Sequence, residues 1–566
     1  MKLAVALNFN NLFPDEKELD VLDYLKRIPK KILLEFIGFC NTNPLPNYYN
    51  FFSKPEVSEN IISRVNFFYK NKNSKNNLEV ITPYSYLKFT EIVLLNINDF
   101  SITEEANEDI ELNLFKAFLV LNSNLNDYNH DFNSEKGIES FVNFFTLQSF
   151  QLSEISNYID DRNEFIKLVY STIYKVENLL DFLTRKGLIN EKRKFIESFD
   201  FQSEKDFLYE MKYLFSVLLV CKNNNQFIFT NENFTSFKLI KNITLKNITE
   251  NEDFTELKKY PIYFIEENRF SIINFYFVID LFYRSAKFRL KEIFSIENTN
   301  HKDFFSFYTT EFSEKFLMKN LLDDIFSKTY FLKKNNYELE KMSEPDYYIN
   351  YKNSIILFEN KDILINKNIK SAREIKVIKD FLNDKLFQSK KKGVGIKQLV
   401  NSIESIYKKT FVFDPHINYN KKIEIYPILL LHDRIFQSFG INYILNDWFR
   451  NELLERNIIN NDKFVVHSLT VIDIDTLIFW RDNIKNNFGL IKSLLLNHIK
   501  HLNEKPQKSY SNDQYFNNYL QRLLRPISSR NTPFFLPKDF SNQLLNLLKE
   551  EQFRPLDAQS FYNSGV

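Results

Sequence analysis

Glycine is scarce in this chain, with eight glycines among 566 residues. Phosphate-binding loops depend on glycine, because a backbone without Cβ can approach a phosphate closely and adopt turn conformations that other residues avoid. No glycine-rich loop ends in a Gly-Lys-Ser or Gly-Lys-Thr sequence, and Gly393-Val394-Gly395 lacks the remainder of a dinucleotide-binding sequence. Built-in ATP hydrolysis and a nicotinamide cofactor are therefore disfavoured.

Cysteine is scarcer still, since the chain contains only Cys40 and Cys221. Two cysteines make neither a disulfide framework nor a zinc site, which fits a reducing compartment. No apolar run approaches the ~20 residues that a membrane-spanning helix needs. The apolar start at residues 1–7 is shorter than the usual apolar region of a signal peptide. These absences predict a cytoplasmic protein that does not associate with a membrane.

Histidine does not compensate for the missing thiols. His498 and His501 lack cysteine partners and lie on a segment with helical spacing, so a solvated helix face is expected there. Asp473 and Asp475 precede another helical segment. They allow a metal site, but helix capping explains them more simply, and Asp475 is the expected N-cap.

Aromatic residues, by contrast, are abundant, with 60 Phe and 30 Tyr. This apolar material is ample for large cores, so disorder is not expected as the main state. The chain is also longer than one core usually supports, which predicts two or three domains. Apolar residues at three- and four-residue spacing indicate a mainly helical region over residues 1–255.

The most informative local feature is a predicted β-hairpin that carries two acids and a lysine. Residues 345–351 alternate in polarity, residues 352–354 have turn composition, and residues 355–359 form an apolar run of strand length. Side chains two positions apart on a strand share a face, so Glu359 and Lys361 point the same way. The hairpin can bring Asp346 beside Glu359.

These residue types suit metal-dependent phosphodiester cleavage. A divalent cation held by two carboxylates offsets the charge that develops on phosphate and polarises a bound water. Oxygen ligands favour Mg²⁺ or Mn²⁺. A neighbouring lysine can orient the water or stabilise the developing charge. The alternative is an ordinary edge hairpin with solvent-facing charges.

The flanking segments favour the metal site. A helical pattern starts near Glu311, a second helix is expected from Gly395, and residues 423–432 read as a buried strand. This order of helix, acidic hairpin, helix and strand resembles the core of the PD-(D/E)xK nuclease superfamily, which has the restriction-endonuclease-like fold. The resemblance implies that Asp346 and Glu359 are metal ligands and that Lys361 is the catalytic lysine. It also implies a metal-binding role for Glu314 on the first helix and a catalytic role for Gln398 on the second.

The sequence thus predicts an α+β multidomain protein. Its expected parts are a mainly helical N-terminal region, a restriction-endonuclease-like α/β core with a central mixed sheet, and a helical C-terminal extension. The expected boundaries are a helical domain for recognition or regulation at 1–255, a hairpin-helix connector at 256–304, the nuclease-like core at 305–482, and the extension at 483–566.

A basic segment lies beside the proposed site. Residues 350–425 contain 16 Lys and Arg against 8 Asp and Glu, although the net charge of the whole chain is +1. A local excess of this kind attracts polyanions. The residues expected to contact nucleic acid are Lys390, Lys391, Lys392 and Lys397. The alternative is a solvated helix face.

The leading functional hypothesis is a Mg²⁺-dependent endonuclease that cleaves DNA, and by resemblance a bacterial restriction or antiphage effector. The second hypothesis is a non-catalytic nucleic-acid-binding or scaffold protein with a nuclease-like core. A third is that the acids bind a structural cation. DNA is expected as a partner rather than RNA, and a protein partner or homo-oligomer is compatible with the large helical region.

Overall fold

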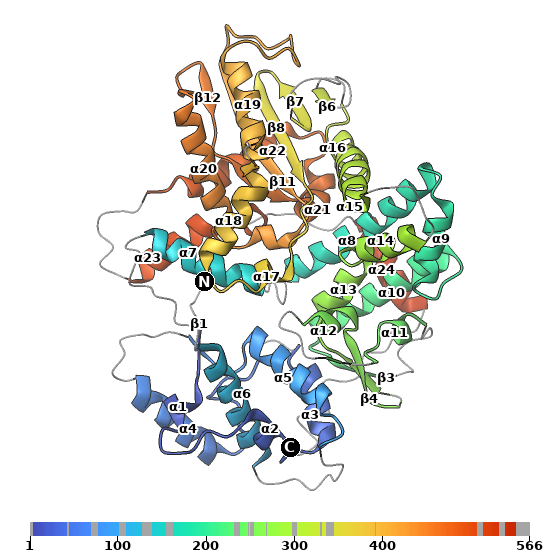
Figure 1. Ribbon diagram of the computed structural model, residues 1–566, viewed down its shortest axis with the longest axis vertical. Coiled ribbons are helices and arrows are strands. Elements are labelled where there is room, and N and C mark those ends of the chain that lie inside the picture. Colours follow the sequence, from blue (N-terminus) through green and yellow to red (C-terminus); the bar gives the residue numbers. More distant parts are fainter. Residues whose placement is uncertain are drawn as a thin grey trace. The chain divides into compact units, whose positions relative to one another are not determined.

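In the computed structural model, the chain forms two compact units. Figure 1 labels the helices and strands of the chain. Unit 1 comprises residues 1–131, 193–286 and 539–566, and unit 2 comprises residues 132–192 and 287–538. The structure describes residues 4–41, 45–69, 77–100, 109–126, 138–153, 162–230, 238–246, 248–249, 254–267, 269–296, 303–328, 331–335, 345–390, 392–505, 513–530 and 538–550.

Within its described residues, unit 1 is mainly helical and has two small sheets, one with the order β1-β2 and the other with the order β3-β5-β4. Its elements are β1 (Ala4–Ala6), α1 (Phe9–Leu12), α2 (Val21–Leu25), α3 (Lys30–Phe39), α4 (Pro55–Tyr69), β2 (Asn77–Glu79), α5 (Pro83–Leu95), α6 (Ile110–Asn126), α10 (Glu204–Asn223), β3 (Ile228–Thr230), α11 (Lys238–Asn242), α12 (Thr255–Lys259), β4 (Ile262–Glu266), β5 (Arg269–Ile272), α13 (Phe275–Tyr283) and α24 (Lys538–Glu550). Helices α9 (Ile189–Glu197) and α14 (Ala286–Ile296) run across the limits of the units.

Unit 2 contains a mixed sheet with the order β12-β11-β8-β7-β6, in which β13 also pairs with β11. Its elements are α7 (Ile138–Leu152), α8 (Arg162–Arg185), α15 (Phe304–Phe307), the π-helix η2 (Tyr308–Met318), α16 (Lys319–Ile325), β6 (Leu332–Asn335), β7 (Tyr347–Tyr351), β8 (Ser354–Lys361), α17 (Lys367–Lys370), α18 (Ile375–Leu386), β9 (Gln388–Ser389), β10 (Lys392–Gly393), α19 (Ile396–Tyr407), β11 (Ile423–Leu431), the 3₁₀ turn η4 (Arg434–Gln437), α20 (Ile441–Glu455), β12 (Phe464–Val466), β13 (Thr470–Asp473), α21 (Ile474–Ile484), α22 (Phe488–Leu502), α23 (Asp513–Leu524) and the 3₁₀ turn η5 (Ile527–Ser529).

Strand β8 lies inside this sheet, antiparallel to β7 and parallel to β11. Its residues alternate between two helical layers, because successive side chains of a strand point to opposite faces. Ile355 and Leu357 pack in one apolar core with residues of α18 and α19. On the other face, Phe358 contacts the ring of Tyr347, whose hydroxyl donates to Asp323 of α16. The α+β class with a central mixed sheet is therefore confirmed, while the restriction-endonuclease-like fold stays a prediction.

The segment 132–192 belongs to the same unit as the sheet, which differs from the predicted helical domain 1–255. Helix α8 packs on α21 and on η2. Its buried Lys175 places Nζ 2.5 Å from Oδ1 of Asp475, so the contact is ionic as well as apolar. Helical periodicity reveals a buried face but not the partner of that face, and for this reason the sequence did not separate α7 and α8 from unit 1.

Two predictions for polar residues in unit 2 are wrong. The N-cap of α21 is Asp473, whose Oδ1 accepts from the amide of Thr476 at 2.7 Å, and Asp475 lies within the first turn. His498 is fully buried and does not lie on a solvated face. Its Nε2 lies 2.8 Å from Oδ1 of Asn442, and Nε of Arg530 donates to its Nδ1 at 2.7 Å.

Candidate metal centre

A tight turn aligns the two strands that carry the predicted site residues. Tyr351 pairs with Ser354, so the loop of the β7–β8 hairpin consists of Lys352 and Asn353. Both loop residues have positive φ, 53° and 65°, as a type I′ turn requires. The same register pairs Tyr347 with Phe358 at the other end of the hairpin.

Because Asp346 directly precedes the pair of Tyr347 and Phe358, it lies across from Glu359 on the Leu357 face of the sheet. The carboxylate of Asp346 is held there by a hydrogen bond from the backbone amide of Asn360 to Oδ2, at 2.7 Å. Lys361 shares this face, and its Nζ lies 2.6 Å from Oε1 of Glu359. The structure therefore brings together the three central residues that the sequence predicted.

Glu359 is fully buried, and one of its carboxylate oxygens has no hydrogen bond in the described structure. Its side chain is 0% exposed, and Oε2 is buried with no hydrogen-bond partner among the described residues. Burial raises the pKa of Glu359 to about 8, the charge of Asp346 adds to this rise, and Lys361 partly offsets it. A buried carboxylate oxygen without a hydrogen bond lowers the stability of the fold unless a positive group or a proton satisfies it.

The surrounding carboxylates stabilise the charged form of Lys361. Burial alone would lower the pKa of this lysine, but Glu359, Asp346 and Glu314 together raise it. Its side chain keeps 25% exposure, so Lys361 is partly accessible to solvent. A permanently charged lysine here can stabilise negative charge on a group that approaches from solvent.

Glu314 contributes less than the other two acids. It lies on η2 and acts on Glu359 and Lys361 through its charge. Within the described ranges, however, no three His, Cys, Asp or Glu side chains are grouped as metal ligands. A cation here would therefore depend on Asp346 and Glu359, with Glu314 as a nearby charge.

The donor set of Asp346 and Glu359 fits a hard divalent cation. Both groups offer carboxylate oxygens, the ligand type that Mg²⁺ and Mn²⁺ prefer. Mg²⁺ commonly uses one or two protein carboxylates and keeps several waters. The unbonded Oε2 of Glu359 is the acceptor that such a cation would satisfy.

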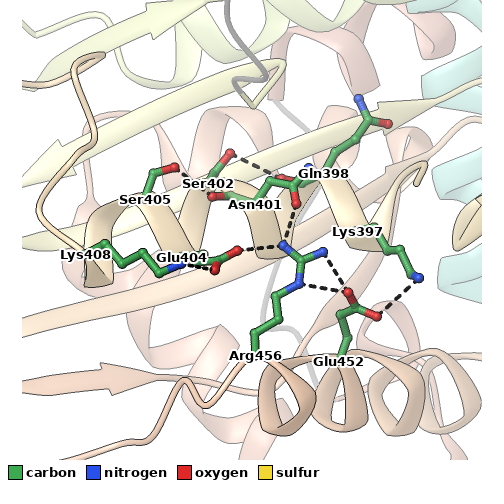
Figure 2. A network of polar contacts seen from close by, with 9 residues as sticks. All are labelled: Lys397, Gln398, Asn401, Ser402, Glu404, Ser405, Lys408, Glu452 and Arg456. Carbon is green, nitrogen blue, oxygen red and sulfur yellow. Dashed lines mark hydrogen bonds and ion pairs between the residues drawn. The ribbon is translucent and has the colours of Figure 1, made fainter. Parts of the chain in front are cut away.

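The side chain of Gln398, which was predicted to be catalytic, makes a hydrogen bond within its own helix start. Its Oε1 accepts from the backbone amide of Gly395 at 2.8 Å, which caps the start of α19. Its side chain extends away from Arg456 in Figure 2. No hydrogen bond joins its side chain to Asp346, Glu359 or Lys361 in the described structure, and its catalytic role stays a prediction.

Lys397 is already engaged by neighbouring groups. Its Nζ lies 3.4 Å from Oε2 of Glu452. Figure 2 draws this ion pair as a dashed line. The same Nζ donates to Gln388 at 2.9 Å and lies 4.6 Å from the ring centroid of Phe387. These contacts describe a helix-packing lysine, and binding of nucleic acid by Lys397 stays a prediction.

The other predicted basic residues lie at the β9–β10 hairpin. Lys390 and Lys392 are exposed there, and Lys391 lies outside the described residues. The backbone of Lys390 has φ 45°, which is typical of a tight turn. This hairpin therefore presents positive charge to solvent.

The sequence did not identify the polar residues on the opposite face of β8. Nε2 of His432 lies 2.8 Å from Oδ1 of Asn360. Asp362 lies 3.2 Å from Nζ of Lys287 and accepts from Oγ of Ser313 at 2.7 Å. Burial alone would raise the pKa of Asp362, but Lys287, His432 and Ser313 lower it to about 2. The available signal was the strand alternation itself, which places residues 360 and 362 on one face.

No helix in the described part of the chain combines the length and the apolar character needed to cross a membrane. The cytoplasmic location stays a prediction.

Comparisons with known proteins show a distant similarity to a curated protein. No family model matches the chain, and no solved structure matches it. The chain is 24% identical over 565 residues to Protein Ycf2 of Physcomitrium patens, a match that covers 96% of this chain and 22% of that protein. The chain thus spans about a fifth of the length of this curated relative.

This similarity corrects the functional hypothesis drawn from the sequence. Protein Ycf2 does not point to a nuclease. The expectation of a DNA endonuclease with a restriction or antiphage role is therefore wrong. The geometry at the end of β8 needs an account that does not depend on the nuclease resemblance.

Proposed function

We propose that Asp346 and Glu359 bind a divalent cation, Mg²⁺ or Mn²⁺, and that this centre gives the chain a metal-dependent phosphodiesterase activity. The observation that carries the proposal is the buried, unbonded Oε2 of Glu359 beside the charge of Asp346. Burial of two acids side by side destabilises their charged forms, and a bound cation reverses this effect.

Each residue of the centre has a distinct part in the proposed chemistry. A divalent cation, when bound, supplies Lewis acidity and a more acidic bound water. Asp346 and Glu359 would hold the cation. The backbone amide of Asn360 keeps the Asp346 carboxylate in place. Lys361, which keeps partial access to solvent, stabilises the negative charge that develops on a phosphodiester.

The first prediction is that Glu359→Gln removes cation binding and hydrolysis together. We expect wild-type protein to bind Mg²⁺ or Mn²⁺ in calorimetry and to hydrolyse bis(p-nitrophenyl) phosphate. Glu359→Gln should reduce hydrolysis by about 10²–10⁴-fold, because it removes a charged ligand in a shielded site.

Glu424→Gln is the matched control, since Glu424 also lies on this sheet but pairs with Lys422 and Lys492. It should leave cation affinity and hydrolysis near the wild-type values. The proposal fails if wild-type protein binds neither cation, or if Glu359→Gln and wild type behave alike.

A structural cation is the second candidate, because the same unbonded carboxylate oxygen would be satisfied by a cation that only stabilises the fold. In that case Mg²⁺ should raise the melting temperature of the wild type but not of Glu359→Gln, and no phosphodiester substrate should be hydrolysed. Hydrolysis in the wild type that disappears with EDTA excludes this candidate.

A polyanion, nucleic acid included, is proposed as a partner of the β9–β10 hairpin. The support is the exposure of Lys390 and Lys392 in a segment with an excess of basic residues. Attraction of this kind depends on phosphate charge and does not require base recognition. A protein partner or a homo-oligomer stays a prediction.

A further inference from the structure

The residues at the carboxyl end of β8 alternate between the two faces of the sheet. Glu359 and Lys361 belong to the face that forms the candidate cation site, whereas Asn360 and Asp362 belong to the opposite face. Asn360 and Glu359 are buried on these two faces, with 4% and 0% exposure. The geometry of the site therefore depends on what holds the opposite face.

Asn360 connects the two faces directly. Its backbone amide donates to Oδ2 of Asp346 at 2.7 Å, and its side-chain Oδ1 lies 2.8 Å from Nε2 of His432. His432 follows β11, where Leu430 pairs with Asn360 and Leu431 with Lys361. The imidazole thus meets the side chain of Asn360 from the adjacent strand, at the position where β8 leaves the sheet.

The protonation of His432 follows from its contacts. Burial lowers the pKa of this imidazole to about 4, an effect that Asp362 partly offsets, so the ring is neutral near pH 7. Since Oδ1 of Asn360 is an acceptor, Nε2 carries the ring proton. Nδ1 is buried without a hydrogen-bond partner in the described structure. The bond to Asn360 is therefore the hydrogen bond that fixes the orientation of this ring.

We propose that Asn360 and His432 are positioning residues of the cation site: His432 fixes the side chain of Asn360, and Asn360 fixes the carboxylate of Asp346. This inference rests on the proposed function. Residues that hydrogen-bond to metal ligands, without contacting the metal themselves, commonly change metal affinity by about 10–100-fold when they are replaced. Lys287 and Ser313, which hold Asp362, support the same strand end through a separate contact.

The test compares His432→Leu with His432→Gln and with a matched histidine elsewhere. His432→Leu keeps the side chain apolar and bulky but removes the donor to Asn360. His432→Gln keeps an N–H donor. His498→Leu is the control, because His498 is also buried and its Nε2 also lies 2.8 Å from an asparagine Oδ1, that of Asn442.

We expect His432→Leu to bind Mn²⁺ about 10–100-fold more weakly than wild type in calorimetry. His432→Gln should recover most of this affinity, and His498→Leu should bind like wild type whatever its melting temperature. If His432→Leu is folded and binds Mn²⁺ with wild-type affinity, or if His498→Leu loses as much affinity, the inference is overturned.

A second measurement does not depend on the cation. Hydrogen exchange of the β8 peptide in EDTA should be faster in His432→Leu than in wild type, and unchanged in His498→Leu, because the Asn360 amide loses its fixed acceptor. If His432→Leu does not fold, Asn360→Ser replaces it, since serine keeps the peptide amide but cannot reach His432 in the same way.

The two measurements separate this inference from the proposed function. Absence of Mn²⁺ binding by the wild type rejects the proposed function, whereas the exchange result still decides whether His432 positions Asn360 and Asp346. Unchanged exchange in both His432→Leu and Asn360→Ser overturns the positioning role even if the wild type binds Mn²⁺.

Discussion

Glu359 should make the stability of the cation-free protein depend on pH. Its pKa is raised from 4.5 to about 8, mainly by burial. The folded state therefore holds a proton that the unfolded state releases above about pH 4.5, and the stabilisation from this proton is lost as pH rises through about 8. We therefore compare the free energy of unfolding of wild type with that of Glu359→Gln, both in EDTA. As the pH rises from about 5 to about 9, the value for wild type should decrease relative to the value for the variant.

Urea titrations of both proteins across that range provide the measurement. Mg²⁺ should restore part of the lost stability at the alkaline end in wild type alone, because it replaces the proton on the carboxylate. A constant difference between the two proteins at every pH would contradict this account of Glu359.

Individual residues were predictable where their partners are near in sequence. Asp346, Glu359 and Lys361 lie on one hairpin, so turn composition and alternation were enough to bring them together. His432 was not predictable in the same way, because its contact with Asn360 depends on the pairing of β8 with β11. The prediction of a solvated position for His498 was wrong for the same reason, because its partners Asn442 and Arg530 lie on other segments.

At the scale of elements, the β9–β10 hairpin allows a test of polyanion binding. Replacing Lys390 and Lys392 with Gln should weaken binding of a fluorescein-labelled oligonucleotide. Each lost phosphate contact should also reduce the slope of log K against log salt by about 0.7–0.9. Fluorescence anisotropy over a series of salt concentrations measures both effects.

The control for the hairpin replaces Lys421 and Lys422, which are also exposed but precede β11, with Gln. It should leave the salt slope unchanged. Equal losses in the two double variants would show that only net charge matters, and would remove the argument for a specific surface at the hairpin.

The limits of strands β12 and β13 could not be read from residue composition alone. Residues 464–472 have the composition of one continuous strand, yet the structure has β12 and β13, with residues 467–469 between them. β12 pairs with Ile423–Ile425 and β13 with residues 428–431, so the break faces the part of β11 that contains Pro427. Proline has no amide proton to donate, which accounts for an interrupted ladder there.

For the whole molecule, the contact between α8 and α21 should be a main determinant of stability in unit 2. Lys175 and Asp475 are both buried, and Lys175 lowers the pKa of Asp475 against the effect of burial. Lys175→Met leaves a buried carboxylate without its cation, and we expect a loss of about 3–5 kcal/mol in the free energy of unfolding. Urea unfolding followed by circular dichroism measures this loss.

Two companion variants make this prediction specific. The double variant Lys175→Met with Asp475→Leu should recover most of the stability, because it removes both buried charges. Lys186→Met, which removes a more exposed partner of Glu311, should change stability by less than about 1 kcal/mol. A small effect of Lys175→Met would mean that α8 is held on α21 by apolar contacts alone.

The division of the chain into units has a consequence for its synthesis. Unit 1 is built from three separate segments and unit 2 from two, so the polypeptide passes between the units four times. As the chain emerges from the ribosome, α7 and α8 are made long before β8, β11 and α21. The faces of α7 and α8 that pack in unit 2 therefore lack these partners until later in synthesis. Unit 1 likewise receives its last segment only after residue 538. Neither unit can therefore be completed during synthesis before most of the other exists, and a single proteolytic cut cannot release either one intact.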